Sequence, residues 1–182
     1  MAYITILIIV LIGIVLLFIL AYNKLISFRN QTENAWSQID VQLKRRYDLI
    51  PNLIETVKGY MKHEKETLKN ITELRAKLVN GSVNEKAKAN SQFSNLMNGI
   101  FAIAENYPKL KASKNFLGLQ EELSATENKI SYARQFYNDS VYGLNTAIES
   151  FPTNVIAGIF NFSKKEYFEI EGEARKSVKV QF

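Results

Sequence analysis

The first 23 residues constrain the fold more than any other segment, because none of them carries a charged side chain. Residues 3–22 read YITILIIVLIGIVLLFILAY and are apolar almost throughout. An α-helix needs about 20 apolar residues to cross a bilayer, whereas a cleavable signal peptide has a basic start and a shorter apolar run. We therefore predict a permanent transmembrane anchor at residues 1–23, with lipid-facing side chains that include Ile4, Leu7, Leu11, Val15, Phe18 and Tyr22.

The charges beside the anchor predict its orientation. Lys24 and Arg29 follow it closely, while only the terminal amine precedes it. Because cytoplasmic flanks are enriched in Lys and Arg, we expect a single-pass protein of the cell membrane with its N-terminus outside and its bulk in the cytoplasm. The net charge of +5 suits a domain near anionic lipid, and membrane lipid is an expected partner.

Beyond the anchor, apolar residues recur at helical spacing. One column runs in multiples of seven through Trp36, Leu43, Ile50, Val57, Ile71 and Leu78, with a companion column at Ile39, Leu53, Tyr60 and Leu74. This pattern, typical of helices that pack as in coiled coils, predicts one amphipathic helix from about Lys24 to Leu78. Asn80 and Gly81 form a suitable helix stop.

Two further long helices and one short helix are expected. The capping-box pattern from Ser82 to Glu85 begins a helix that Pro108 ends. A strict heptad column then predicts a helix from about Ser113, with Phe116, Leu123, Ile130, Tyr137, Leu144 and Phe151 on one face. Residues 153–160 suit a short fourth helix.

Strand signals are nearly absent, so the predicted fold class is all-α. An N-terminal transmembrane helix precedes an antiparallel bundle of three to four helices, several of them long. The expected organisation is an anchor at 1–23, a helical bundle at 24–162 and an extended C-terminal tail at 163–182.

Pro51 interrupts the first long helix of the bundle. Asp48 is suited to cap a new helix with Pro51 in its first turn, where proline is tolerated. The heptad register is unchanged across Pro51, however, which favours a bend in one continuous helix.

The same residues resemble a known family. The blocks AWSQIDVQLKRRYDLIPNLIETVKGYMKHE, YPKLKASKNFLGLQEELSATENKISYARQFYN, FPTNVIAGIF and VKVQF look like the LemA family of bacterial membrane proteins. The resemblance implies an N-terminal anchor, a helical-bundle domain and no established enzymatic activity, with a link by association to membrane zinc proteases of the HtpX type. Asn161 departs from the family pattern, which usually has glycine there.

No pattern of an active site is found. A di-iron centre in a bundle needs Glu-x-x-His pairs from two helices, but the chain has one histidine, His63, preceded at three residues by Tyr60. The chain also lacks cysteine and a Gly-rich phosphate loop. We therefore expect no enzyme, with no catalytic, cofactor-binding or metal-binding residue and no small-molecule substrate.

The basic run Lys44, Arg45 and Arg46 does not indicate nucleic-acid binding. Consecutive residues fan around a helix at about 100° each and so cannot line one side of it. No aromatic residues alternate with these cations to stack on bases. Nucleic acid is therefore not an expected partner.

Arg46 occupies a position of the apolar companion column. An unpaired charge buried there would be very costly, so Arg46 should meet a carboxylate, for which Asp40, Asp48 and Glu127 are the candidates. Glu127 lies one heptad before Arg134. We interpret Arg46, Glu127 and Arg134 as a polar network between helices.

Helix lengths suggest self-association. The helix from Val83 to Tyr107 would be about half as long as the predicted helix from Lys24 to Leu78. If the helices run up, down and up, the stripe at Trp36, Ile39 and Leu43 has no partner within the chain, and residues 137–151 overshoot. Exposed apolar stripes mark contact surfaces, so we predict a homo-oligomer. Its candidate interface comprises Trp36, Ile39, Leu43, Arg46, Asp48 and Pro51.

These expectations favour a non-enzymatic, membrane-anchored helical scaffold that self-associates and presents its bundle to other proteins. One alternative is an accessory or adaptor subunit of a membrane protease of the HtpX type. Another is a module that binds lipid or an envelope polymer.

Overall fold

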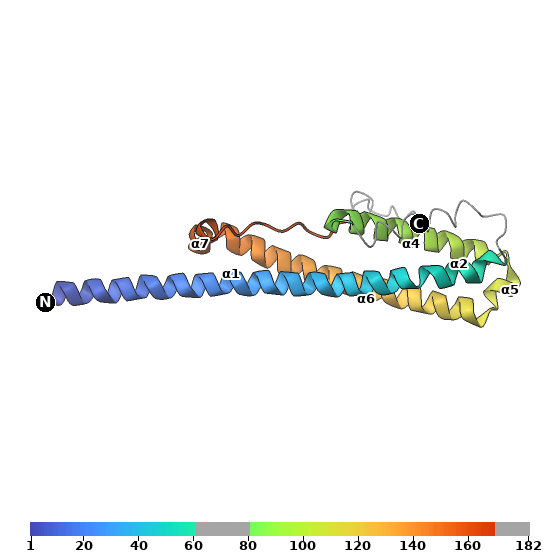
Figure 1. The fold of residues 1–182 in the computed structure, drawn as a ribbon, viewed down its shortest axis with the longest axis horizontal. Coiled ribbons are helices and arrows are strands. Elements are labelled where there is room, and N and C mark those ends of the chain that lie inside the picture. Colours follow the sequence, from blue (N-terminus) through green and yellow to red (C-terminus); the bar gives the residue numbers. More distant parts are fainter. Residues whose placement is uncertain (61–80, 170–182) are drawn as a thin grey trace, which may run out of the picture. The chain divides into compact units, whose positions relative to one another are not determined.

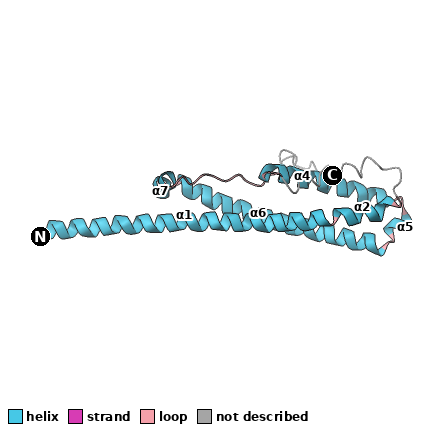
Figure 2. Ribbon diagram, in the orientation of Figure 1, coloured by secondary structure: helices cyan, strands magenta, loops and turns pink. Residues whose placement is uncertain are grey.

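The structure, a computed structural model, describes residues 1–60 and 81–169. Within these ranges the chain forms helices and loops and no strand, which confirms the all-α prediction (Figures 1 and 2). The helices are α1 (Ala2–Asp48), α2 (Ile50–Lys58), α4 (Val83–Ala104), α5 (Pro108–Lys111), α6 (Lys114–Glu149) and α7 (Thr153–Ile159).

The N-terminal part of α1 is long enough and apolar enough to cross a membrane, and only 6% of its most apolar window is buried. The six predicted anchor residues lie here: Ile4, Leu7, Leu11, Val15 and Phe18 are exposed, and Tyr22 is half-buried. No glycine or proline occurs between Ile14 and Asp48, so nothing in the sequence weakens the helix where it leaves the apolar segment.

A single residue, Leu49, separates α1 from α2. Its backbone stays in the right-handed helical region, at φ −78° and ψ −19°, and Pro51 lies in the first turn of α2, where its missing N–H costs no helical hydrogen bond. The chain thus passes Pro51 with a one-residue interruption at Leu49 and keeps a helical course from Ala2 to Lys58, in line with the favoured bend. Leu49 stands at the N-cap without a side-chain cap, so the cap at Asp48 that belonged to the alternative of a new helix does not form. The heptad column stays buried across the junction, at Leu43, Ile50 and Val57.

The described part of α2 ends at Lys58 and is followed by a turn. The predicted continuation through Ile71, Leu74 and Leu78, and Asn80 of the predicted stop, lie outside the described residues. At the start of α4 the predicted capping box is confirmed: Ser82 Oγ accepts from Glu85 N at 3.4 Å, and Glu85 Oε2 accepts from Ser82 N at 2.8 Å.

The heptad column of α6 is confirmed except at its end. Buried positions are Phe116, Leu123, Ile130, Tyr137 and Leu144, whereas Phe151 lies beyond the helix and is 83% exposed.

The predicted short helix is α7, and it ends in a Schellman turn. Asn161 adopts the left-handed conformation at φ 54°, where asparagine is one of the few side chains tolerated in place of glycine. Phe162 N donates to Ala157 O at 2.9 Å, and Asn161 N donates to Gly158 O at 3.4 Å. The departure from the family pattern at this position therefore leaves the turn intact.

The chain divides into two compact units, Met1–Trp36 with Phe136–Glu166 and Ser37–Gln135 with Tyr167–Phe182. In the first unit α6 runs antiparallel to α1, as three contacts show: Phe28 with Gly143, Thr32 with Ser140, and Trp36 with Tyr137. Its core near the anchor consists of Ala21, Leu25, Ala147, Ile156 and Ala157.

In the second unit α4 runs parallel to α1. Lys86 of α4 pairs with Asp40, and Asn90, one helical turn later, binds Arg46. Glu127 of α6 also meets Arg46, while earlier residues of α6 line one pocket with residues of α2, so α6 runs antiparallel to α1 and α2.

This arrangement overturns the argument from helix lengths. That argument assumed that successive helices alternate in direction. Because α4 instead runs with α1, α6 starts beside α2 and returns along α1, so residues 137–149 do not overshoot. Ile39 and Leu43 are then 0% and 1% exposed within the chain, and Trp36 packs on Tyr137 with ring centroids 5.4 Å apart. The expectation that this stripe lacks a partner within the chain is wrong.

The chain after α7 follows α6 without forming a helix, as far as Glu169. Asn145 Nδ2 donates to Lys165 O at 3.0 Å, and Asn145 Oδ1 accepts from Lys165 N at 2.9 Å. Tyr137 Oη donates to Glu166 O at 2.8 Å. Residues 163–169 of the predicted tail form no helix, and the rest of the tail lies outside the described residues.

Candidate functional site

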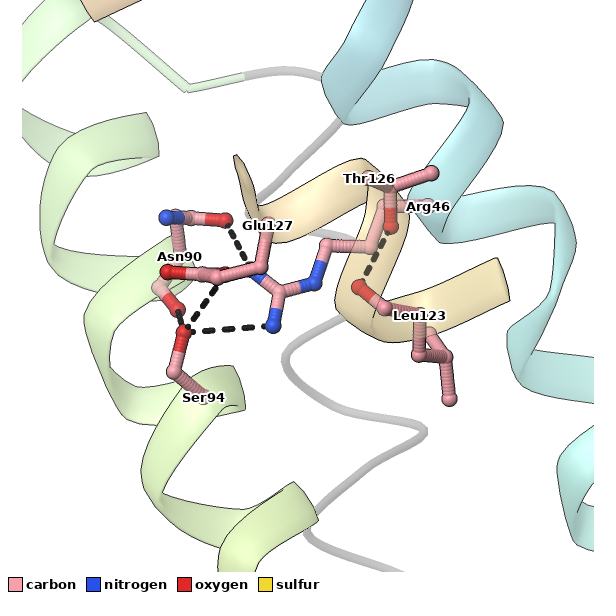
Figure 3. A network of polar contacts seen from close by, with 6 residues as sticks. All are labelled: Arg46, Asn90, Ser94, Leu123, Thr126 and Glu127. Carbon is pink, nitrogen blue, oxygen red and sulfur yellow. Dashed lines mark hydrogen bonds and ion pairs between the residues drawn. The ribbon is translucent and has the colours of Figure 1, made fainter. Parts of the chain in front are cut away.

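The polar cluster around Arg46 is the most unusual group of side chains in the second unit (Figure 3). Arg46 projects from α1 into the helix interface, where its side chain is only 3% exposed. Heptad spacing places it between Ile39 and Leu53, both of them fully buried. A cation at this position can be stable only if other helices supply compensating groups.

Two helices supply those groups. Glu127 of α6 forms an ion pair with Arg46 Nη1, which confirms one of the three carboxylate candidates. From α4, Asn90 Oδ1 accepts from Arg46 Nη1 at 2.7 Å, and Ser94 Oγ accepts from Arg46 Nη2 at 3.2 Å. Ser94 Oγ also lies 3.1 Å from Glu127 Oε2 and donates to it. The network thus joins α1, α4 and α6.

An aromatic ring completes the surroundings of the guanidinium. Arg46 Cζ lies 4.7 Å from the centroid of the fully buried Phe93 ring, a favourable cation–π distance. Arg46 Nε is buried and has no hydrogen-bond partner among the described residues. Burial lowers the pKa of Arg46, against the opposing effect of the Glu127 carboxylate, which favours the charged form.

A groove of about 310 Å³ lies beside the network. Its lining combines amide and hydroxyl side chains, among them Asn98, Gln120, Ser124 and Asn128, with the apolar side chains of Met97, Phe101 and Leu123. In the described part of the chain no three His, Cys, Asp or Glu side chains gather to hold a metal ion. The arrangement can therefore fix helix register. Its hydroxyl–carboxylate contact, between Ser94 and Glu127, is held by Arg46, which binds both residues.

The remaining predicted site residues lie apart from this network. Arg134 makes no ion pair with Glu127 among the described residues, so its predicted membership of the network is wrong. Asp48 is exposed and Pro51 half-buried. Since Ile39, Leu43 and Arg46 are buried within the chain, they cannot form the predicted interface in this fold. His63 lies outside the described residues.

The sequence reasoning missed a second polar contact between α1 and α4. Lys86, whose side chain is 10% exposed, forms an ion pair with Asp40. A signal was available: Lys86 and Asn90 stand at the three-to-four spacing of the buried Phe93 and Met97, so α4 carries two polar residues on its apolar stripe.

Comparison with known proteins now places the chain. A model of the LemA family matches residues 35–182. The chain belongs to the LemA family. This confirms the resemblance seen in the sequence blocks, and the match includes Arg46, Asn90, Ser94 and Glu127 of the network.

Individual relatives agree with the family assignment. Protein LemA of Metamycoplasma hominis is 32% identical over 154 residues, which cover 82% of this chain and 70% of that protein. Magnetosome protein MamQ 2 of Paramagnetospirillum magneticum is 22% identical over 178 residues, or 83% of this chain and 65% of the relative. Magnetosome protein MamQ of Magnetospirillum gryphiswaldense is 22% identical, with 82% and 65% covered. Neither LemA nor MamQ is the name of an enzyme.

Proposed function

We propose that this LemA-family chain is a non-enzymatic, membrane-anchored helical scaffold that self-associates at the membrane and presents its bundle to other proteins. The observation that carries the proposal is the continuity of α1. Its apolar N-terminal part is almost wholly exposed, and the same helix then contributes to the folded core from Ala21 onward. A cleavable leader would not be expected to build part of the core.

The anchor is proposed to emerge on the cytoplasmic side. Lys24 and Arg29 follow the apolar segment, and the positive-inside rule favours their retention in the cytoplasm. The chain would cross the membrane once, with its N-terminus outside.

Self-association is now supported by the outer face of α6 instead of the buried stripe of α1. Tyr132 of α6 is 75% exposed. Large aromatic side chains are enriched at the centres of protein interfaces. We therefore move the candidate contact surface to the face of α6 that carries Tyr132.

Mass photometry of the full-length protein in mild detergent tests this proposal. We expect one discrete species larger than a monomer, and we expect Tyr132→Ser to shift it towards the monomer. Gln135→Ser, at an exposed polar neighbour on the same helix, is the matched control and should leave the particle unchanged.

The alternative adaptor function predicts a different result. An accessory subunit of a membrane protease would be monomeric alone and would co-purify with that protease at a fixed ratio. A monomer at all concentrations, whatever the residue at position 132, would contradict self-association.

A further inference from the structure

The segment that contains α7 carries an unusual surface. From Ser150 to Ser163 the chain has no charged side chain. Four large apolar residues in it are exposed: Phe151 by 83%, Val155 by 55%, Ile159 by 60% and Phe160 by 46%. A helix in water normally turns polar residues outward, so this outer surface is not explained by folding in water.

The inner face of α7 is already occupied. Ile156 and Ala157 are buried in the core formed with Ala21, Leu25 and Ala147. Apart from the exposed Asn154, the helix is therefore apolar on both sides, a property of helices that are enclosed by protein or by lipid. Its outer side lacks such an environment in the isolated chain.

Ring contacts place this surface beside the anchor. The Phe160 ring lies 4.7 Å from the Tyr22 ring and 6.0 Å from the Phe18 ring, measured between centroids. About 20 residues of helix fill the hydrocarbon core, so a span that begins near Tyr3 ends near Tyr22. A bilayer that surrounds Phe18 must then reach Phe160 as well.

Cationic side chains lie close in sequence to these aromatic residues, both on α1 and just after α7. Lys24 and Arg29 are exposed on α1, and Lys164 and Lys165 are exposed just after α7. Arg29 Cζ lies 5.5 Å from the centroid of the Phe162 ring. Aromatic rings at the end of a span with cations next to them are typical of the membrane–water interface.

We infer that α7, together with Phe151, is a second membrane-binding element that inserts the side chains of Phe151, Val155, Ile159 and Phe160 into the leaflet from which α1 emerges. Its partner is the lipid bilayer, and the inference rests on the proposed anchoring by α1. A second copy of the chain is a poorer occupant, because it would have to displace lipid around Phe18 to cover Phe160.

Fluorescence quenching by brominated lipid tests this assignment. The full-length chain, with its single tryptophan removed by Trp36→Phe, receives one new probe by Val155→Trp and is reconstituted into vesicles of phosphatidylcholine and phosphatidylglycerol. Lipids brominated close to the headgroup should quench about half of the fluorescence, since an interfacial side chain lies about 5–10 Å into the headgroup and acyl boundary. Tyr132→Trp, at an exposed aromatic in the middle of α6, is the matched control and should not be quenched.

A third variant separates this inference from the anchor. Leu11→Trp reports insertion of α1 and should be quenched most by lipids brominated near the chain ends. Quenching at Leu11→Trp but not at Val155→Trp would overturn the role of α7 and leave the anchor in place. Blue-shifted emission at Val155→Trp without quenching by bromine would show that protein covers the surface, and would also overturn it. No quenching at either position would refute the anchor, and the role of α7 with it.

Discussion

Arg46 places a permanent positive charge inside a helix interface. Its stabilisation depends on Glu127, Asn90 and Ser94, which come from two other helices. Removing one partner of a buried pair leaves the other charge desolvated without compensation, and that loss exceeds the value of the pair itself. The buried charge of Arg46 is therefore stable only when α1, α4 and α6 pack in this arrangement.

We expect Glu127→Ala to lower the free energy of unfolding by about 2 kcal/mol. A fully buried pair would lose about 3–5 kcal/mol, but the Glu127 side chain is 43% exposed, so water screens part of the effect. Urea unfolding in mild detergent, followed by circular dichroism, measures the change. Glu121→Ala, at an exposed carboxylate on the same helix, should stay within about 0.5 kcal/mol of the wild type. Equal values for both variants would contradict a structural role of the pair.

The raised pKa of Tyr137 predicts that the free energy of unfolding falls at alkaline pH. Burial raises the pKa of Tyr137 above its ordinary value of 10.0, and the Glu166 carboxylate raises it further. Above pH 10 the unfolded chain loses this proton while the folded chain keeps it, so stability falls as pH rises through the folded pKa. Tyr137→Phe should cost about 1 kcal/mol at pH 7 through its lost hydrogen bond and should show a shallower fall of stability above about pH 10. Parallel pH profiles for the two proteins would refute the assignment to Tyr137.

Among the elements, the extended segment after α7 depends most on a single side chain. Asn145 binds both the N–H and the C=O of Lys165, and it does so from a buried position on α6. A backbone without helix or sheet hydrogen bonds needs such partners, because unpaired polar groups cannot be buried cheaply.

We expect Asn145→Ala to release this segment. Two hydrogen bonds of about 1 kcal/mol each are lost, so amide exchange at residues 163–166 should become roughly tenfold faster or more, while exchange in the centre of α6 changes little. Hydrogen–deuterium exchange with mass spectrometry measures both regions. Asn154→Ala, at an exposed amide of α7, should not accelerate exchange in the tail. Uniform acceleration throughout the first unit would instead indicate general destabilisation.

For the molecule as a whole, orientation in the membrane is directly measurable because the natural sequence has no cysteine. If the N-terminus is outside, Ala2→Cys should react with a membrane-impermeant maleimide in intact cells, whereas Ala125→Cys, at an exposed position of α6 away from the candidate contact surface, should react only after lysis. The exposed positions of both residues remove poor accessibility as a trivial explanation. The reverse labelling pattern would place the bundle outside the cell and would favour the envelope-binding alternative.

The sequence predicts local features of this fold better than the directions of its helices. The heptad column from Phe116 to Leu144 and the pairing of Arg46 with Glu127 follow from spacing and from the cost of a buried charge. The parallel direction of α4 cannot be predicted from the sequence, because an apolar stripe has the same spacing whichever way its helix runs.

The role of Asn145 could not be predicted from the sequence either. A single amide among the small residues of α6 has no periodicity, and its partner is the backbone of Lys165, which any residue provides. The outward apolar surface of α7 was visible in the sequence as an uncharged run, but its position beside Phe18 depends on the return of α6 along α1.

The absence of glycine and proline from α1 after Gly13 has a mechanical consequence. The helix continues from the apolar segment to Trp36 without a residue that favours a kink. Ala21 and Leu25 of this helix pack on Ala147 of α6 and on Ile156 and Ala157 of α7. A helix span tilts to match the thickness of the surrounding bilayer. Since the helix is stiff, any such tilt turns the attached first unit by the same angle. In the proposed membrane-anchored state, bilayer thickness would thereby set the inclination of that unit at the membrane surface.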